Sequence, residues 1–227
     1  MKAWFGRRYL DLLGSIYIYN EHRGYTALDR VLKAVKARHP EATDFIAAVE
    51  KHRADERKHY VMFKRWFELR GQMPIAVDRT FGHIDRFVEI AFGRSIDSLD
   101  TDAIIASDEL FERLCRVISL TEKRGLAQVE ILLENRFVRS DKALHKIFQV
   151  VHVDEPSHFE PYDQWLRDNS GRKPGFWERG IDRLIHSELL FIKLPLLFLH
   201  FGAKRRTDWA DAAESNPRPV PRSLVTA

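Results

Sequence analysis

The sequence contains a single cysteine, Cys115, among its 227 residues. One thiol cannot form an intrachain disulfide, and it cannot build a multi-cysteine zinc site, an iron–sulfur cluster or a rubredoxin-type site. A metal site in this chain would therefore have to use histidine and carboxylate side chains.

The first residues also have little of the pattern expected of a signal peptide. Lys2, Arg7 and Arg8 precede an apolar stretch, but Asp11 and Glu21 interrupt it and no small-residue cleavage site follows. We expect this segment to be a helix of a cytoplasmic protein.

Charge of one sign is not in large excess, since the formal net charge is only +4. The basic residues are spread along the chain, and no zinc-finger, helix-turn-helix or RNA-recognition signature is present, so we expect no nucleic-acid partner. Hydrophobic residues make up 44% and charged residues 31% of the chain, which is typical of a globular protein. Dividing the length by about 150 residues per domain predicts one domain with an extension.

Apolar residues recur at spacings of three and four almost throughout, and alternation with period two is never sustained. We therefore predict an all-α protein. The pattern predicts two long helical hairpins, a crossover at 72–101 with a short helix near 78–92, and a further helix. The long helices are expected at 9–38, 43–70, 102–138, 141–168 and 177–201. This wiring predicts an antiparallel four-helix bundle over 1–170, an additional amphipathic, apolar helix within 171–204, and a disordered tail at 205–227.

Six polar residues interrupt the apolar faces of the four bundle helices. They are Glu21, Glu56, His59, Glu122, Glu155 and His158. Residues at i and i+3 share a helix face, so each Glu-x-x-His motif directs two side chains to one place. Four inward carboxylates need a counter-charge, and the matching levels of these faces contain no inward lysine or arginine. Two divalent cations would balance them.

The two halves of the chain repeat the pattern. Glu21 precedes Glu56 by 35 residues and Glu122 precedes Glu155 by 33, so each helical hairpin brings its two carboxylates to one height. Glu-x-x-Gly occurs at 21–24 and 122–125, and Asp-Glu-x-x-His at 55–59 and 154–158. An internal duplication explains this symmetry.

This arrangement resembles the ferritin-like di-iron carboxylate superfamily over about residues 9–168. The resemblance implies two iron ions held by the six residues, with manganese or a mixed Mn/Fe pair as alternatives. It also implies that Asp55 and Asp154 are hydrogen-bond partners of the metal-bound histidines. His52 and His152, four and three residues before the motif glutamates, resemble the additional histidine of arylamine N-oxygenases; each is a metal ligand, a partner of one, or solvated.

Two prolines lie in or near the second motif. Pro156 is inside it and Pro161 follows, so we expect a kink or a π-bulge in this helix. If Pro156 began a new helix, Glu155 would leave the inward face.

Four tyrosines lie within about a turn of the expected ligands: Tyr17, Tyr25, Tyr60 and Tyr162. They are either core residues or contacts for a substrate or a radical.

The last predicted helix contains an apolar run at 189–199, followed by Lys204, Arg205 and Arg206. Because a bilayer-spanning helix needs about 20 apolar residues, this run is too short to cross a membrane. It either docks on the bundle, buries a homodimer interface, or lies in a membrane interface through residues 184–206 on the cytoplasmic face.

The resemblance implies a di-iron oxygenase or hydroxylase that uses O2 to oxidise a mostly apolar small molecule. An external electron donor would be needed, because the chain has no cysteine cluster to deliver electrons. The alternatives are a ferroxidase or another iron- or peroxide-handling protein, and a non-catalytic metal-binding bundle.

Overall fold

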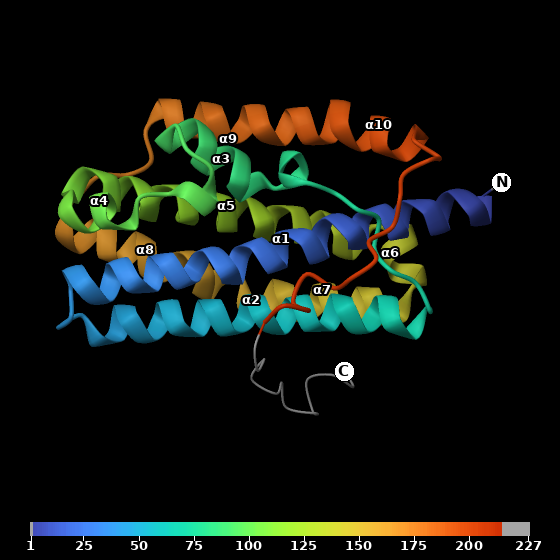
Figure 1. The fold of residues 1–227 in the computed structure, drawn as a ribbon, viewed down its shortest axis with the longest axis horizontal. Coiled ribbons are helices and arrows are strands. Elements are labelled where there is room, and N and C mark those ends of the chain that lie inside the picture. The colour runs from blue at the N-terminus through green and yellow to red at the C-terminus, as the bar shows by residue number, and fades with distance from the viewer. Residues whose placement is uncertain (1, 215–227) are drawn as a thin grey trace.

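The computed structural model describes residues 2–214, and within this range the chain is all-helical, with one isolated β-bridge and no strand. The helices form a bundle with an additional outer layer (Figure 1). The α-helices are α1 (Lys2–Arg38), α2 (Thr43–Leu69), α3 (His83–Phe92), α4 (Thr101–Ala106), α5 (Asp108–Glu134), α6 (Arg136–Ser140), α7 (Lys142–Asp154), α8 (Pro156–Asn169), α9 (Phe176–Glu188) and α10 (Leu194–Leu199), with a π-helix η3 (Leu189–Lys193) between the last two.

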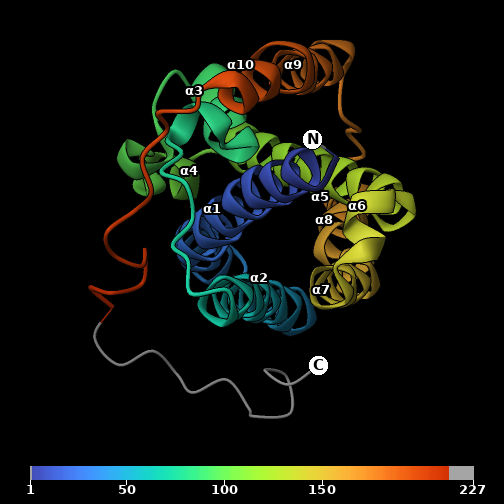
Figure 2. The ribbon, with the colours of Figure 1, turned by 90° about the vertical axis from the view of Figure 1, so that its right-hand side faces the viewer.

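Four helical rods surround a common interior. Helices α1 and α2 pack along each other as one hairpin, and α5 packs against α7 and α8 as the second. Seen end-on, these rods form a ring (Figure 2). The buried apolar residues fall into two clusters, one containing Val49 and Trp165 and the other containing Phe63 and Phe148. On α2, the buried polar residues Glu56 and His59 come after Val49 of the first cluster and before Phe63 of the second.

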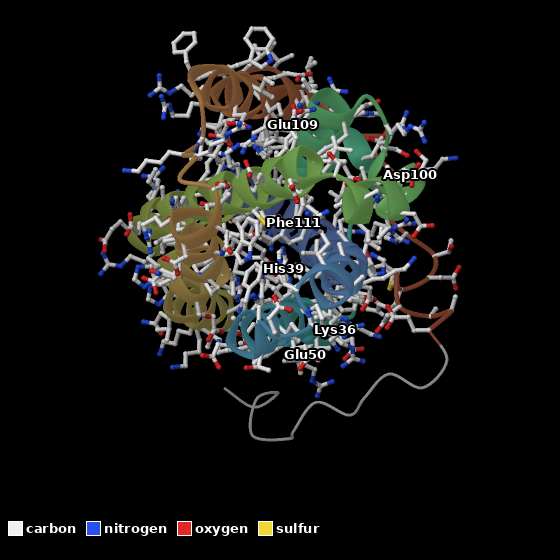
Figure 3. The ribbon with its side chains drawn as sticks, turned by 90° about the vertical axis from the view of Figure 1, so that its left-hand side faces the viewer. Lys36, His39, Glu50, Asp100, Glu109 and Phe111 are labelled. Atoms are coloured by element: carbon white, nitrogen blue, oxygen red, sulfur yellow. The ribbon has the colours of Figure 1, made fainter. Side chains whose placement is uncertain are left out.

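One end of the ring is closed by aromatic side chains. His39 and Phe111 lie inside the ring of helices, with ring centroids 5.5 Å apart, and Phe111 packs edge-on to Trp165 (Figure 3). Lys36 and Glu50 point outward and form a surface ion pair. Phe111 and Trp165 are buried, so their rings fill the interior of the bundle at this end.

The predicted helix at 102–138 is wrong in its extent, because the chain breaks it at Ser107 and Asn135. Ser107 has an extended backbone and its hydroxyl accepts a hydrogen bond from the Leu110 amide. The Asn135 side chain accepts from the amides of Phe137 and Val138. Side chains of these types satisfy free amides at a helix start better than they fit a helix interior.

The fourth rod is divided at Pro156. Helix α7 ends at Asp154 and α8 begins at Pro156. Glu155 nevertheless keeps right-handed helical dihedrals, with φ −50° and ψ −42°, and its amide donates to Val151 O at 3.0 Å. A new helix therefore does begin at Pro156, but Glu155 stays buried at 6% exposure. The expectation that such a start would move Glu155 off the inward face is wrong.

Helix α9, η3 and α10 lie lengthwise over the bundle as an outer layer (Figure 1). Their inner side packs against α1, α3 and α5. The helix predicted at 177–201 is thus present in three segments, and Pro195 lies near the start of the last one. Among the described residues, none of the helices has the length and apolarity needed to cross a membrane.

The segment after α10 follows the bundle surface. Arg205 makes an isolated β-bridge with Ile75 and ion pairs with Asp11. Further along, Asp211 accepts hydrogen bonds from the Tyr60 hydroxyl and from Lys64, each at 2.9 Å. The prediction of disorder from residue 205 is therefore wrong for 205–214, because these polar contacts fix the segment. The rest of the predicted tail, 215–227, lies outside the described residues.

Candidate metal centre

The six interrupting residues come from all four rods and face one another. Glu21 lies on α1, Glu56 and His59 on α2, and Glu122 on α5. The remaining two, Glu155 and His158, lie at the α7–α8 junction and on α8. Both histidines are fully buried, and the side chain of the most accessible glutamate, Glu122, is 18% exposed.

Glu56 lies between the two histidines. Its Oε1 atom is 3.4 Å from His158 Nδ1 and 4.0 Å from His59 Nδ1. The same nitrogen of each ring lies near a second carboxylate: His59 Nδ1 is 3.2 Å from Glu21 Oε2, and His158 Nδ1 is 3.8 Å from Glu155 Oε2. Both Nδ1 atoms thus face the carboxylates, as metal-binding nitrogens would.

Two overlapping groups of side chains bring their ligand atoms within 4.8 Å of one another. One group is Glu21, Glu56 and His59, and the other is His52, Glu56, Glu122 and His158. Because Glu56 belongs to both groups, it is in the position of a ligand shared by two adjacent metal ions.

The two motif aspartates contact the outer nitrogens of the histidines, each across the hairpins. Asp154 Oδ2 lies 2.9 Å from His59 Nε2, and Asp55 Oδ2 lies 3.5 Å from His158 Nε2. A carboxylate on Nε2 favours a proton there and leaves the Nδ1 lone pair free for a metal. The sequence predicted the two aspartates, but not that each one serves the histidine of the other hairpin.

Two lysines neutralise these aspartates. Lys58 lies 2.7 Å from Asp55 and 2.6 Å from Asp154, and Lys51 lies 2.5 Å from Asp55. Burial tends to raise the pKa of both aspartates, but contacts with the histidines and lysines outweigh it, so both pKa values are lowered. Sequence reasoning missed the lysines, although they lie four and three residues from Asp55, spacings that share its helix face.

Within residues 2–214, the ion pairs of the four glutamates are with histidines. Burial raises the pKa of Glu56, and the negative charges of Glu21, Glu122 and Glu155 raise it further. For the same two reasons the pKa of Glu155 is raised, and that of Glu122 is raised to about 8. Clustered carboxylates with raised pKa values are the expected consequence of burying like charges together without a cation.

Few positive charges near the four glutamates are available to neutralise them. Burial disfavours the charged form of His59, but hydrogen bonds with Asp154 and Glu21 outweigh it and raise its pKa to about 9. Arg124, two residues after Glu122, donates from Nε to Asp182 at 2.7 Å. His59 can therefore offset at most one of the four negative charges when no metal is bound. The donor set of carboxylates and imidazoles suits iron or manganese.

His52 and His152 have different surroundings. His52 is 1% exposed, and its Nε2 lies 3.7 Å from Glu122 Oε1 and 3.9 Å from Glu56 Oε1. By contrast, the side chain of His152 is 41% exposed and lies 3.8 Å from Glu130. Of the alternatives for these two residues, the solvated one therefore holds for His152, and its assignment as a partner of a metal ligand is wrong. One residue of difference in spacing rotates a side chain by about 100° around a helix.

The four tyrosines divide into two pairs. Tyr17 and Tyr162 face the centre: the Tyr162 hydroxyl lies 3.4 Å from His52 Nδ1, and the buried Tyr17 hydroxyl has no hydrogen-bond partner among the described residues. Burial raises the pKa of Tyr17, and nearby Glu21 adds to this. Tyr25 and Tyr60 instead bond to carboxylates of the segment after α10.

The repeated Glu-x-x-Gly motif leaves room for the carboxylates of the opposite helix. A Cβ atom on Gly24 would lie 2.1 Å from Glu56 Oε2, which is a clash, whereas one on Gly125 would lie 3.4 Å from Glu155 Oε1. The sequence shows both glycines at the same position of the repeat. It does not show which carboxylate each glycine accommodates, because that depends on contacts between helices.

A cavity of about 390 Å³ reaches the centre. Its walls include Glu21, Glu56, Glu122, Glu155 and His52, together with many apolar side chains of α1 and α5. Residues of α9, η3 and α10 complete the wall, among them Leu189, Leu190, Leu194 and Phe198. A mostly apolar molecule could therefore lie beside the carboxylates, and this role of the outer layer was not predicted.

The candidate centre thus combines clustered carboxylates, histidines that contact aspartates, and an adjoining apolar cavity. Comparisons of the chain with protein-family models, with curated proteins and with solved structures gave no significant match.

Proposed function

We propose that this chain is a ferritin-like carboxylate protein that binds two metal ions, with iron as the first choice and manganese or a mixed pair as alternatives. Glu21 and His59 would hold one ion, and Glu122, Glu155 and His158 the other, with Glu56 shared between them. The observation that carries this proposal is the convergence of four glutamates from four helical rods without a matching number of cations. Three of them are buried and Glu122 is half-buried, and Glu155 lies outside the two groups of closest ligand atoms. Two divalent ions would neutralise four carboxylates.

We further propose that the protein is a di-iron oxygenase or hydroxylase. Two bound ferrous ions would supply the site for O2 and part of the electrons needed to reduce it. One oxygen atom would enter a C–H bond of the substrate and the other would leave as water. An external donor must supply the two electrons and two protons that balance this reaction, because the buried thiol of Cys115 is the chain's only cysteine.

The chain's own residues would orient and enclose the reaction. Asp154, 2.9 Å from Nε2 of His59, would hold a proton on that nitrogen and keep Nδ1 available as a ligand. Asp55, 3.5 Å from Nε2 of His158, would do the same for the second histidine. The apolar clusters on both sides of the centre exclude bulk water. The cavity would hold an apolar substrate next to the glutamates.

The cavity favours oxidation of an organic molecule over iron storage. A ferroxidase needs a route for ions, and such routes are typically lined by carboxylates. In this cavity the carboxylates are those of the four proposed ligands, and most of the remaining lining is apolar. Storage or peroxide handling is therefore the second candidate.

The test is the reaction of the iron-loaded protein with O2. The full chain is loaded with ferrous iron without air and then exposed to O2, while O2 uptake and the remaining ferrous iron are followed. We expect rapid oxidation that stops once the bound iron has reacted, and no such reaction in Glu56→Ala. Glu134→Ala, which removes an exposed carboxylate from α5, is the matched control.

Two outcomes would contradict the proposal. A ferrous protein that is stable in air would exclude O2 activation. Continued oxidation of added iron far beyond the bound amount, together with a large cage-like assembly, would favour iron storage instead.

A further inference from the structure

The outer surface of α9, η3 and α10 is unusually apolar. Fifteen large hydrophobic residues are exposed among the described residues, and nine of them lie within 176–201. Trp4 and Phe5 extend the same surface, because their rings pack against Phe198 and Phe201. We call these eleven residues the outer apolar face: Trp4, Phe5, Phe176, Trp177, Leu184, Leu190, Phe191, Ile192, Leu196, Leu199 and Phe201. So large an apolar surface marks an interaction site.

The helical spacing explains why this face is continuous. Trp177, Leu184 and Phe191 are seven residues apart, so they share one side of the helix, and they are 76%, 64% and 78% exposed. The opposite side, with Ile181 and Ile185, is buried against the bundle. The layer lies lengthwise on the molecule (Figures 1 and 2), and its 24 residues span about 36 Å at 1.5 Å per residue.

The charges around this face are one-sided. The acidic residues of the layer are paired with cations of the protein: Glu178 with Arg116, Asp182 with Arg124, and Glu188 with Lys193. The exposed charged residues along α9 and the loop before it are basic, and they are Arg172, Lys173, Arg179 and Arg183. The outer apolar face is therefore flanked by cations.

We propose that the outer apolar face binds in the interface of an anionic membrane, with α9 and α10 lying in the plane of the bilayer. Apolar side chains would enter the boundary of the acyl chains while the flanking cations contact lipid phosphates. Tryptophans such as Trp177 and Trp4 are favoured at this depth because their rings are apolar with one polar N–H group. A second copy of the chain fits less well, because a twofold interface would bring the same cationic flanks together.

This placement also bears on the proposed function. Leu190 belongs to the outer apolar face and also lines the cavity, and Leu189 and Leu194 line the cavity from the same segment. The layer would thus lie between the bilayer and the cavity, with Leu190 in contact with both. An apolar substrate could pass through this layer from the lipid to the centre. This step rests on the proposed function, whereas membrane binding itself does not.

Vesicle co-sedimentation of the full chain tests the proposal. We expect binding to vesicles of phosphatidylcholine mixed with phosphatidylglycerol, weaker binding to phosphatidylcholine alone, and loss of binding at high salt. The double variant Trp177→Ser, Phe191→Ser should bind at least about tenfold more weakly. Ile131→Ser is the matched control, because Ile131 is 72% exposed on α5, outside the outer apolar face.

A charge variant tests whether the flanking cations contact lipid phosphates. Arg179→Glu, Arg183→Glu should reduce binding to the anionic vesicles and leave the helix content unchanged, as measured by circular dichroism. Each measurement is repeated on Glu56→Ala, which should bind vesicles like the natural chain even if it binds no metal. A failure of membrane binding and a failure of the metal centre can then be told apart.

The proposal is overturned if the chain binds neither kind of vesicle. It is also overturned if Trp177→Ser, Phe191→Ser binds as well as the natural chain. A stable dimer in solution that the same double variant dissociates, without vesicle binding, would assign the face to a second copy instead.

Discussion

Asp154 Oδ2 lies 2.9 Å from Nε2 of His59, although the two residues belong to different helical hairpins. The reciprocal contact joins Asp55 to His158 at 3.5 Å. Each Asp-Glu-x-x-His motif therefore supplies the aspartate that orients the histidine of the other motif. Neither hairpin alone can form an oriented half of the centre.

The first prediction concerns this crossed contact. Asp154→Ala should weaken metal binding by about 10- to 100-fold, because His59 loses the group that fixes its tautomer and ring orientation. Titration with ferrous or manganous ions measures the affinity. Asp168→Ala removes an exposed carboxylate that accepts a hydrogen bond from Gln164, and it should leave the affinity unchanged. Equal affinities of the two variants would show that the contact does not orient a ligand.

The second prediction compares the two glycines of the repeat. Gly24→Ala should greatly lower metal binding, because its Cβ atom would lie 2.1 Å from Glu56 Oε2 and must displace that carboxylate. Gly125→Ala should have a small effect, since its nearest contact would be 3.4 Å from Glu155 Oε1. Metal content and melting temperature of both variants are the measurements. The prediction fails if Gly125→Ala loses as much metal as Gly24→Ala.

The third prediction separates the two additional histidines. His52→Ala should change the absorption spectrum of the cobalt-substituted protein, because His52 Nε2 lies 3.7 Å from Glu122 and 3.9 Å from Glu56. His152→Ala should leave that spectrum unaltered, because the His152 side chain lies at the surface near Glu130. Identical spectra for the natural protein and His52→Ala would show that His52 has no contact with the metal environment.

Periodicity predicted much of the candidate site. The inward faces of helices at 3.6 residues per turn follow directly from the sequence, so the convergence of Glu21, Glu56 and Glu122 was foreseeable. The crossed pairing of Asp55 and Asp154 was not foreseeable, because it depends on how two hairpins pack. Spacing alone did not separate His52 from His152, because they lie four and three residues before their motif glutamates and both spacings fall on the same broad side of a helix.

Helix ends and the last segment were the less predictable parts of the fold. Apolar periodicity continues across Ser107 and Asn135, so it hides the breaks that their side-chain hydrogen bonds create. The order of residues 205–214 depends on long-range partners, such as Asp211 with Tyr60 and Lys64, which composition does not reveal.

The fourth prediction concerns pH and a histidine away from the centre. Burial lowers the pKa of His83 to about 3, against an ordinary value of 6.5, and nearby Arg124 lowers it further while Asp182 opposes the shift. Between these values the unfolded chain binds a proton at His83 and the folded chain does not. The free energy of unfolding should therefore fall as the pH drops from 6.5 toward 3, with His83 contributing up to about 1.4 kcal/mol per pH unit.

Denaturant unfolding of the metal-free protein across this pH range measures the effect. His83→Gln should lose part of the pH dependence, while His200→Gln, at an exposed position, should keep it. A pH dependence that is the same in both variants would contradict a buried neutral His83.

The central claim is that the four glutamates converge inside the bundle because they bind two cations. The most direct measurement is the metal content of the full chain, purified without chelators and analysed beside Glu56→Ala and the surface control Glu134→Ala. We predict about two metal ions per chain in the natural protein and in the control, and loss of both ions in Glu56→Ala. A natural protein without bound metal that also takes up none on addition of iron or manganese, or a Glu56→Ala variant with unchanged metal content, would contradict the account.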